Sequence, residues 1–172
     1  MKGLFIALLL VAAYAADVEN HEGKAEDLFA VKLGYSVTYS SEHAASRYHL
    51  ANLDSPFYCW LPRLPNVHGD WIQVSSPVSK KWTAVETQGC PHANYWITSY
   101  QVEWSDDGVY WGKVDDGYSF PGNNNRNAHV RHWFDEPVWA RTIRLVPKST
   151  YRNGWGGLRF DFIHVGAAKF EQ

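Results

Sequence analysis

The sequence predicts a single all-β domain of antiparallel strands, on three observations. Short runs rich in Val, Ile, Thr and aromatic residues alternate with Gly, Asn, Asp and Pro turns between residues 71 and 165, as is typical of a compact antiparallel β domain. Aromatic residues make up 16% of the chain and charged residues only 20%, which excludes disorder and coiled coil as the main state. A length of 172 residues suits one domain with a full core.

Residues 1–15 have the pattern of an export signal. Lys2 supplies the positive charge, the run from Leu4 to Ala13 is apolar, and Ala13-Tyr14-Ala15 fits the small-x-small cleavage rule. The apolar run is too short to span a bilayer. We therefore expect a signal peptide and a secreted, extracellular mature protein.

The next segment, residues 16–28, is acidic and lacks large apolar side chains before its last residue, which predicts a flexible leader. A short amphipathic helix is the alternative. From Phe29 to Tyr39 apolar residues recur at every second position, the pattern of a strand with one buried face. We expect the domain to span residues 29–166 and residues 167–172 to form a C-terminal tail.

A less regular segment runs from Tyr48 to Asp70, where prolines prevent a long regular element because each removes a backbone donor. Its large apolar residues are either packed beneath the loop or displayed to a partner. They are Phe57, Tyr58, Trp60, Leu61 and Leu64. Base rates favour packing for the set, but we expect Tyr58 or Trp60 to be exposed because a Pro-rich loop has little interior.

Six later runs rich in β-branched and aromatic residues predict strands. They are Trp71–Val74, Trp82–Gln88, Ile97–Ser105, Ala128–Phe134, Thr142–Pro147 and Leu158–Val165. In the third run Tyr100, Val102 and Trp104 alternate with polar residues, which indicates one buried face. Asp107-Gly108 follows with the residues of a tight hairpin turn.

The two cysteines, Cys59 and Cys90, enter an oxidising compartment on export, where a disulfide is the default. If they pair, the closed loop of about thirty residues stabilises the fold by about 3–4 kcal/mol on the chain-entropy model. No cysteine is left for covalent assembly. Neither lies in a C-x-x-C or papain-like context, so a catalytic role is not expected.

Enzyme and nucleic-acid functions find no support in the sequence. It lacks Gly-x-Ser-x-Gly, His-Glu-x-x-His and a phosphate-binding glycine loop. The net charge is -2 with no Lys/Arg block, so no electrostatic footprint for nucleic acid exists. His129 and His132 are three apart on a predicted strand and point to opposite faces, so one zinc cannot readily take both.

Five motifs follow one another along the chain. They are Trp-Ile-Gln-Val, Val-x-Thr-Gln-Gly, Thr-Ser-Tyr-x-Val-x-Trp-Ser-x-Asp-Gly, Ala-Arg-x-Ile-Arg-Leu-x-Pro and Leu-Arg-Phe-Asp, starting at residues 71, 85, 98, 140 and 158. Their ordered combination resembles the discoidin family, also called the coagulation-factor type C domain, over nearly all of the mature chain.

The resemblance implies a distorted jelly-roll β-barrel or sandwich of about eight strands, galactose-binding-domain-like, with binding loops at one end. It also implies a Cys59–Cys90 disulfide, as in retinoschisin-like members, although the additional cysteines by which retinoschisin oligomerises are missing here. Three arginines fall in family motifs at strand positions that favour pairing with buried carboxylates over ligand binding. They are Arg141, Arg144 and Arg159.

The loops that correspond to the family's binding end are Ser40–Ser46, Ser55–Arg63, Pro91–Trp96 and the neighbouring Gly122–His129. A glycan is the first ligand class that we expect, because aromatic faces stack on sugar rings while polar side chains bond hydroxyls. The candidate ligand-binding residues are Tyr58, Trp60, His92, Asn94 and Tyr95. Trp96 adjoins a strand and is expected in the core.

Other partners remain open on the same loops. Relatives in the clotting system insert apolar spikes into phospholipid membranes, and Phe57, Tyr58, Trp60 and Leu61 would form one such spike. The loop matching the first family spike, Ser40 to Ala45, has no large apolar residue. A protein receptor in cell adhesion and a purely structural role in extracellular matrix are further alternatives.

No cofactor is required, but calcium is compatible with oxygen ligands from Asn52, Asp54 and carbonyls of their loop. A single-site domain binds glycans weakly, so adhesion favours multivalency. We therefore expect non-covalent homo-oligomers.

Overall fold

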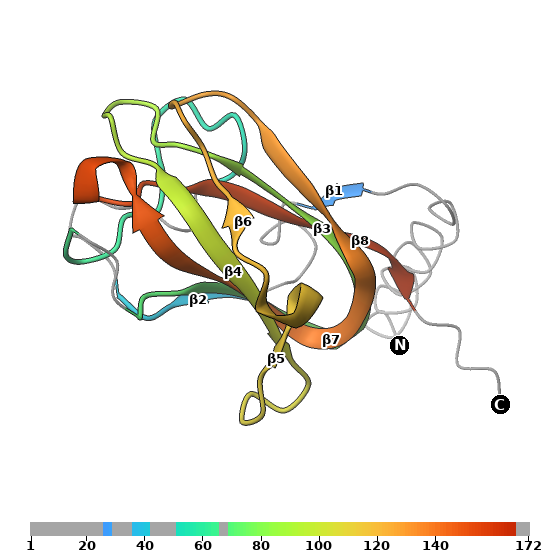
Figure 1. Ribbon diagram of the computed structural model, residues 1–172. Helices are drawn as coiled ribbons and strands as arrows, with labels where there is room; N and C mark the ends of the chain where they lie inside the picture. The colour runs from blue at the N-terminus through green and yellow to red at the C-terminus, as the bar shows by residue number, and fades with distance from the viewer. Residues whose placement is uncertain (1–25, 29–35, 42–50, 66–68, 168–172) are drawn as a thin grey trace, which may run out of the picture.

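The computed structural model describes residues 26–28, 36–41, 51–65 and 69–167, which form one eight-stranded antiparallel sheet wrapped around a single core (Figure 1). The strands are β1 (Glu26–Leu28), β2 (Ser36–Tyr39), β3 (Ile72–Gln88), β4 (Ile97–Ser105), β5 (Gly112–Lys113), β6 (Phe120–Pro121), β7 (Val130–Thr150) and β8 (Arg159–Ala167). Two 3₁₀ turns, η2 (Val114–Gly117) and η3 (Tyr151–Asn153), complete the described elements. The all-β prediction and the strand number are confirmed.

The long strands β3 and β7 form the spine of the sheet. The strand order is β1-β8-β3-β7-β4-β5, with β2 added to β3 and β6 added to β4. The first half of β3 pairs with β2 and its second half with β8, while β7 runs antiparallel along both halves. β3 and β7 therefore carry the chain through both halves of the fold.

Bends in β3 divide these halves. The β3–β7 register shifts between Ser75 and Lys80 and again between Trp82 and Ala84, as expected for bulges that curve a sheet. Pro77 lies in the first irregularity, where its missing N–H removes no ladder hydrogen bond. The sequence predicts separate strands on either side of each bend, because a local pattern shows the alternation of side chains but not the continuity of the backbone.

One hydrophobic core fills the space between the two halves. Its largest fully buried side chains come from both of them and from the loop after residue 50, and they include Trp60, Trp82, Tyr100, Phe162, Ile143 and Leu145. The predicted buried face of Ile97–Ser105 is confirmed for Tyr100 and Val102, which are both 0% exposed.

The ends of the chain are described only in part. β1 pairs with β8, so Glu26–Leu28 is sheet although it falls within the segment for which the sequence predicts a flexible leader. The predicted signal peptide and the residues from 168 onward lie outside the described residues. Within the described part of the chain, no helix has the length and apolar character needed to cross a bilayer.

Candidate functional site

Three loops meet at one end of the sheet, where β3 ends, β4 and β7 begin, and η3 closes the β7–β8 connection (Figure 1). They are residues 51–65, 89–96 and 122–129. The antiparallel pairing of β3, β7 and β8 brings the ends of these strands, and the loops attached to them, to the same place although the loops are far apart in the sequence. Three of the loops that the sequence predicts for binding therefore lie at one end, while residues 42–46 of the fourth, Ser40–Ser46, lie outside the described residues.

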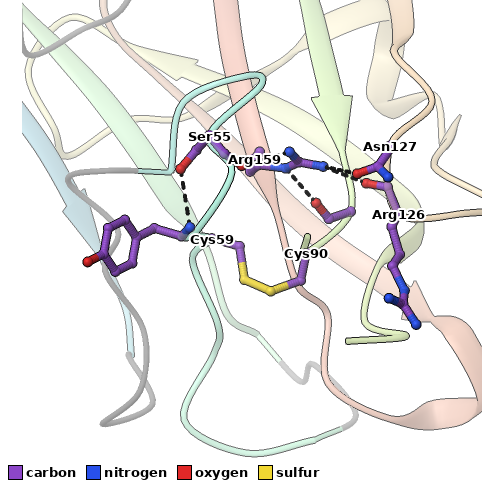
Figure 2. The surroundings of a disulfide bond; sticks show 8 residues. Ser55, Cys59, Cys90, Arg126, Asn127 and Arg159 are labelled. Carbon is purple, nitrogen blue, oxygen red and sulfur yellow. Dashed lines mark hydrogen bonds between the residues drawn. A yellow bond between two sulfur atoms is a disulfide. The ribbon is translucent and has the colours of Figure 1, made fainter. Parts of the chain in front are cut away.

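Arg159 holds the three loops together (Figure 2). Its guanidinium donates hydrogen bonds to the carbonyl oxygens of Gly89 (2.8 Å), Ser55 (2.9 Å) and Arg126 (2.7 Å) and to Oδ1 of Asn127 (2.9 Å). The residue is 3% exposed, so burial lowers the pKa of the guanidinium, although arginine remains charged in proteins. The prediction of a carboxylate partner for Arg159 is wrong, because its guanidinium bonds backbone carbonyls and an amide oxygen.

The other two family arginines differ from one another. Arg144 pairs with the partly buried Glu103 and its guanidinium lies over the rings of Trp71 and Trp111, so the expected carboxylate pairing is confirmed there. Arg141 is exposed, and its backbone N–H donates a hydrogen bond to Oδ1 of Asp106 (3.0 Å).

The predicted disulfide joins two of the three loops. Cys59 and Cys90 are bonded with a Cα–Cα distance of 5.3 Å and are 4% and 7% exposed. Leu61, Tyr95 and Trp155 pack against them in a small second hydrophobic cluster. The disulfide therefore fixes the position of the loop-end residues beside it.

The prediction that Trp60 is a ligand-binding residue is wrong, because its side chain lies in the core. It is 0% exposed and belongs to the main core. Its backbone exchanges two hydrogen bonds with Leu158, and its indole Nε1 donates to the carbonyl of Ser41 (3.1 Å). This short bridge to the residue before β8 draws the side chain inward, so Trp60 cannot stack on a ligand in this structure.

Trp96 and Tyr95, in the 89–96 loop, are buried to different extents. Trp96 is 7% exposed and stacks on Tyr151 with ring centroids 4.2 Å apart, as the sequence predicts for a core residue. Tyr95 is half-buried and its ring packs against Trp155 at 5.6 Å. The Tyr95 ring is therefore partly engaged within the protein.

The other candidate residues reach the surface. Tyr58 is 40% exposed, which confirms the expectation that Tyr58 or Trp60 is exposed, and His92 and Asn94 are also exposed. The His92 ring lies 6.0 Å from the ring of Phe57, which is itself 66% exposed. Aromatic side chains of two different loops thus lie together in solvent.

A polar pair lies on the same loops. Oδ1 of Asn94 accepts hydrogen bonds from Nε (2.9 Å) and Nη2 (2.8 Å) of Arg126. We call Phe57, Tyr58, His92, Asn94 and Arg126 the loop-end surface. Arg126 was missed by the sequence analysis as a site residue, although it lies inside one of the expected loops, because nothing local distinguishes it from a solvated arginine.

A second polar cluster lies beside this end, around His129. Its Nδ1 is 2.5 Å from Oε1 of Glu86 and its Nε2 is 2.9 Å from Oδ1 of Asp54, while Arg131 pairs with the other oxygen of Glu86. Partial burial opposes the imidazolium, but the hydrogen bonds to Asp54 and Glu86 prevail and raise the pKa of His129.

The histidines of β7 and its leading loop occupy opposite faces, as the sequence predicts. His132 packs against Phe120 and its Nε2 lies 2.7 Å from the carbonyl of Pro121, on the side away from His129. Among the described residues, no group of three or more His, Cys, Asp and Glu side chains is arranged to hold a metal ion. Calcium binding by the Asn52–Asp54 loop stays a prediction.

Comparison with known proteins places these features in a family context. The F5/8 type C domain family matches residues 35–162 of the chain. Coagulation factor V of Sus scrofa is 36% identical over 90 residues, which are 48% of this chain and 4% of that protein. Lactadherin of Rattus norvegicus is 37% identical over 109 residues, which are 59% of this chain and 25% of that protein. The chain therefore spans a small part of these relatives.

Solved structures show the same fold. Discoidin II from Dictyostelium discoideum aligns with a TM-score of 0.77 at 21% identity, over 87% of this chain and 62% of that chain. The family 32 CBM from C. perfringens NanJ, in complex with galactose, aligns with a TM-score of 0.63 at 14% identity, over 81% of this chain and 99% of that chain.

Proposed function

The chain belongs to the F5/8 type C domain family, and on this basis we propose that it is a secreted, non-enzymatic recognition module that binds cell-surface or matrix glycans through its loop-end surface. The observation that carries the proposal is the exposed Phe57–His92 ring pair beside the Asn94–Arg126 pair. A solved structure of the same fold is a complex with galactose, which supports a sugar as the ligand class.

The chemistry of the loop-end surface suits a sugar ring. An exposed aromatic face offers a stacking platform for C–H groups, while an amide and a guanidinium bond hydroxyls. Asn94 and Arg126 are already bonded to each other, so both are held in place before a ligand arrives. Pre-ordered side chains lower the entropic cost of binding.

Phospholipid binding, or a protein receptor, is the second candidate for the same loops. Phe57 and Leu64 are 66% and 68% exposed, and large apolar side chains on a loop would insert into a membrane interface. Against this, the three loops contain only two Lys or Arg residues between them, Arg63 and Arg126. Anionic lipid attracts clusters of basic residues, so the glycan is favoured.

The test is a binding screen of the mature protein against a glycan array and against neutral and anionic liposomes, with and without calcium. The variants are Phe57→Ala and Asn94→Ala. Tyr110→Ala is the matched control, because this aromatic side chain is 80% exposed and follows the opposite end of β4. We expect saturable binding to one glycan family that both loop variants abolish and the control retains.

Other outcomes contradict the proposal in distinct ways. Liposome binding that weakens with added salt and is lost in Phe57→Ala would establish the membrane alternative. Glycan binding that the loop variants leave intact would remove the loop-end surface as the site. Absence of both kinds of binding would favour a protein receptor or a structural role in the matrix.

A further inference from the structure

We infer that the pocket beside His129 is a second ligand site, separate from the loop-end surface, and that it takes a neutral or amine-bearing saccharide residue. The pocket has a volume of about 420 Å³, within the range of small-molecule sites. Its lining residues are Asn52, Leu53, Asp54, Glu86, His129, Arg131 and Asp161. None of them belongs to the loop-end surface, so binding at the two sites can be tested independently.

Strand pairing explains why these residues converge. Glu86 on β3 lies between Arg131 on β7 and Asp161 on β8 in direct register, so all three side chains project from one face of the sheet. This face is opposite to the one that carries Val85 and Phe162 into the core. The loop carrying Asp54 lies over the same face and closes the pocket on one side.

The pocket walls are held in place before any ligand binds. Glu86 is 4% exposed and is fixed by both His129 and Arg131. Asp54 is fixed by Gln88, whose Nε2 donates to Oδ1 (3.1 Å) and whose Oε1 accepts from the Asp54 N–H (2.7 Å). Asp54 also has φ 59°, an uncommon conformation for a residue other than Gly that tends to cluster at binding sites.

Hydrogen-bonding capacity remains for a ligand. Oδ2 of Asp54 and the side-chain amide of Asn52 make no hydrogen bond with any other described residue. They provide a carboxylate acceptor, an amide donor and an amide acceptor within three residues of one loop. A sugar ring with adjacent hydroxyls matches such a mixed set.

An exposed aromatic side chain lies next to the pocket. Trp133 follows Arg131 by two positions on β7 and therefore projects from the same face. It is 55% exposed, and the Arg131 guanidinium lies 5.9 Å from its ring centroid. A sugar bonded to Asp54 and Asn52 would thus have a flat apolar surface beside it on which an adjoining ring could stack.

The charge of the pocket selects among saccharides. Three carboxylates, Asp54, Glu86 and Asp161, line it together with two cationic groups, Arg131 and His129. Both ring nitrogens of His129 face carboxylates, so the ring is engaged within the wall. The Asp54 oxygen that is left for a ligand is an anionic acceptor, so it takes neutral hydroxyls or an ammonium group and repels a carboxylate. We therefore expect discrimination against uronic acids.

The experiment is NMR titration of the ¹⁵N-labelled mature protein with galactose, N-acetylglucosamine, glucosamine and glucuronic acid. The variants are Trp133→Ala and Asp54→Asn, with circular dichroism as a check on folding. Trp139→Ala is the matched control, since this second tryptophan of β7 is also exposed, at 44%. Phe57→Ala separates the pocket from the loop-end surface.

We expect saturable shifts at residues 52–54, 129–131 and the Trp133 indole N–H with a neutral or amino sugar. Affinity should fall about tenfold in Trp133→Ala and Asp54→Asn, stay unchanged in Trp139→Ala and Phe57→Ala, and be absent for glucuronic acid. The inference is overturned if no sugar shifts these signals, if glucuronic acid binds equally well, or if Trp139→Ala weakens binding as much as Trp133→Ala. If Trp133→Ala unfolds, Asp54→Asn alone decides, because its carboxylate is largely exposed.

Discussion

Nδ1 of His129 lies 2.5 Å from Oε1 of Glu86, a carboxylate with a side chain only 6% exposed. The contact joins the loop before β7 to the C-terminal end of β3, while Nε2 of the same ring reaches Asp54 on a third segment. A single imidazole ring thus connects three parts of the chain. Its protonation state therefore affects both the pocket and the stability of the loops.

We predict that deprotonation of His129 destabilises the protein at alkaline pH. Burial opposes the charged form, but the hydrogen bonds to Asp54 and Glu86 raise the pKa of His129 in the folded state. The stabilisation is therefore fully present below the ordinary value of about 6.5 and is lost as pH rises through the higher folded pKa. Because the ring is 42% exposed, we expect a loss of at most about 1 kcal/mol.

The measurement is the free energy of unfolding from pH 6 to pH 9 for the wild type and His129→Gln, with an NMR titration of the ring. The charged groups that face the ring are Asp54, Glu86, Arg131 and Asp161. The wild-type advantage should shrink as pH rises. An advantage that grows with pH would mean that the ring is neutral in the folded protein.

His164 is predicted to make the folded protein less stable at acid pH. Burial, followed by the charge of Lys80, lowers the pKa of His164 to about 4, and its ring packs edge-on against Trp82 at 5.4 Å. The unfolded chain binds this proton near pH 6.5, so the folded state loses stability as pH falls from about 6.5 to about 4. The loss is about 3 kcal/mol at its largest.

Urea unfolding at pH 7 and pH 5 measures this loss. His164→Gln should flatten the pH dependence, whereas the same change at the exposed His92 should leave it as in the wild type. Equal slopes for His164→Gln and the wild type would show that another group causes the acid loss.

Replacement of Arg159 is predicted to be severely destabilising. Arg159→Met would leave the carbonyls of Gly89, Ser55 and Arg126 without their donor in a buried region, and each unsatisfied group costs about 1–3 kcal/mol. We expect a loss of at least about 3 kcal/mol in denaturant unfolding. Arg141→Met is the control. Arg141 is an exposed arginine in another motif of the domain, and its replacement should change the free energy of unfolding by less than about 0.5 kcal/mol.

Removal of the disulfide is predicted to cost about 3–4 kcal/mol. The bond closes a loop of sequence separation 31, and the chain-entropy model assigns a loop of that length this stabilisation. Cys59→Ala with Cys90→Ala is preferable to single changes, because one remaining thiol would be reactive. The fold should persist in the double variant, with weaker binding at the loop-end surface; unchanged stability would mean that the unfolded state gains nothing from losing the bond.

The sequence by itself determined the β class, the family and the disulfide. Strand alternation is a local pattern, so Tyr100 and Val102 could be placed in the core from their spacing alone, and His129 and His132 on opposite faces. The ordered motifs identified the family because they carry the same turns and core positions along the whole domain. A chain with two cysteines has one possible intramolecular pairing.

The tertiary structure decided which loop residues are available to a ligand. Loop side chains have no periodicity, so their direction depends on partners far away in the chain: Leu158 draws Trp60 into the core, and three distant carbonyls surround Arg159. The pocket at Glu86, His129 and Asp54 needs the register of three strands and the position of a loop at once. Such convergence is a long-range property that no local pattern encodes, because hydrogen bonds and burial are satisfied only when the whole sheet is assembled.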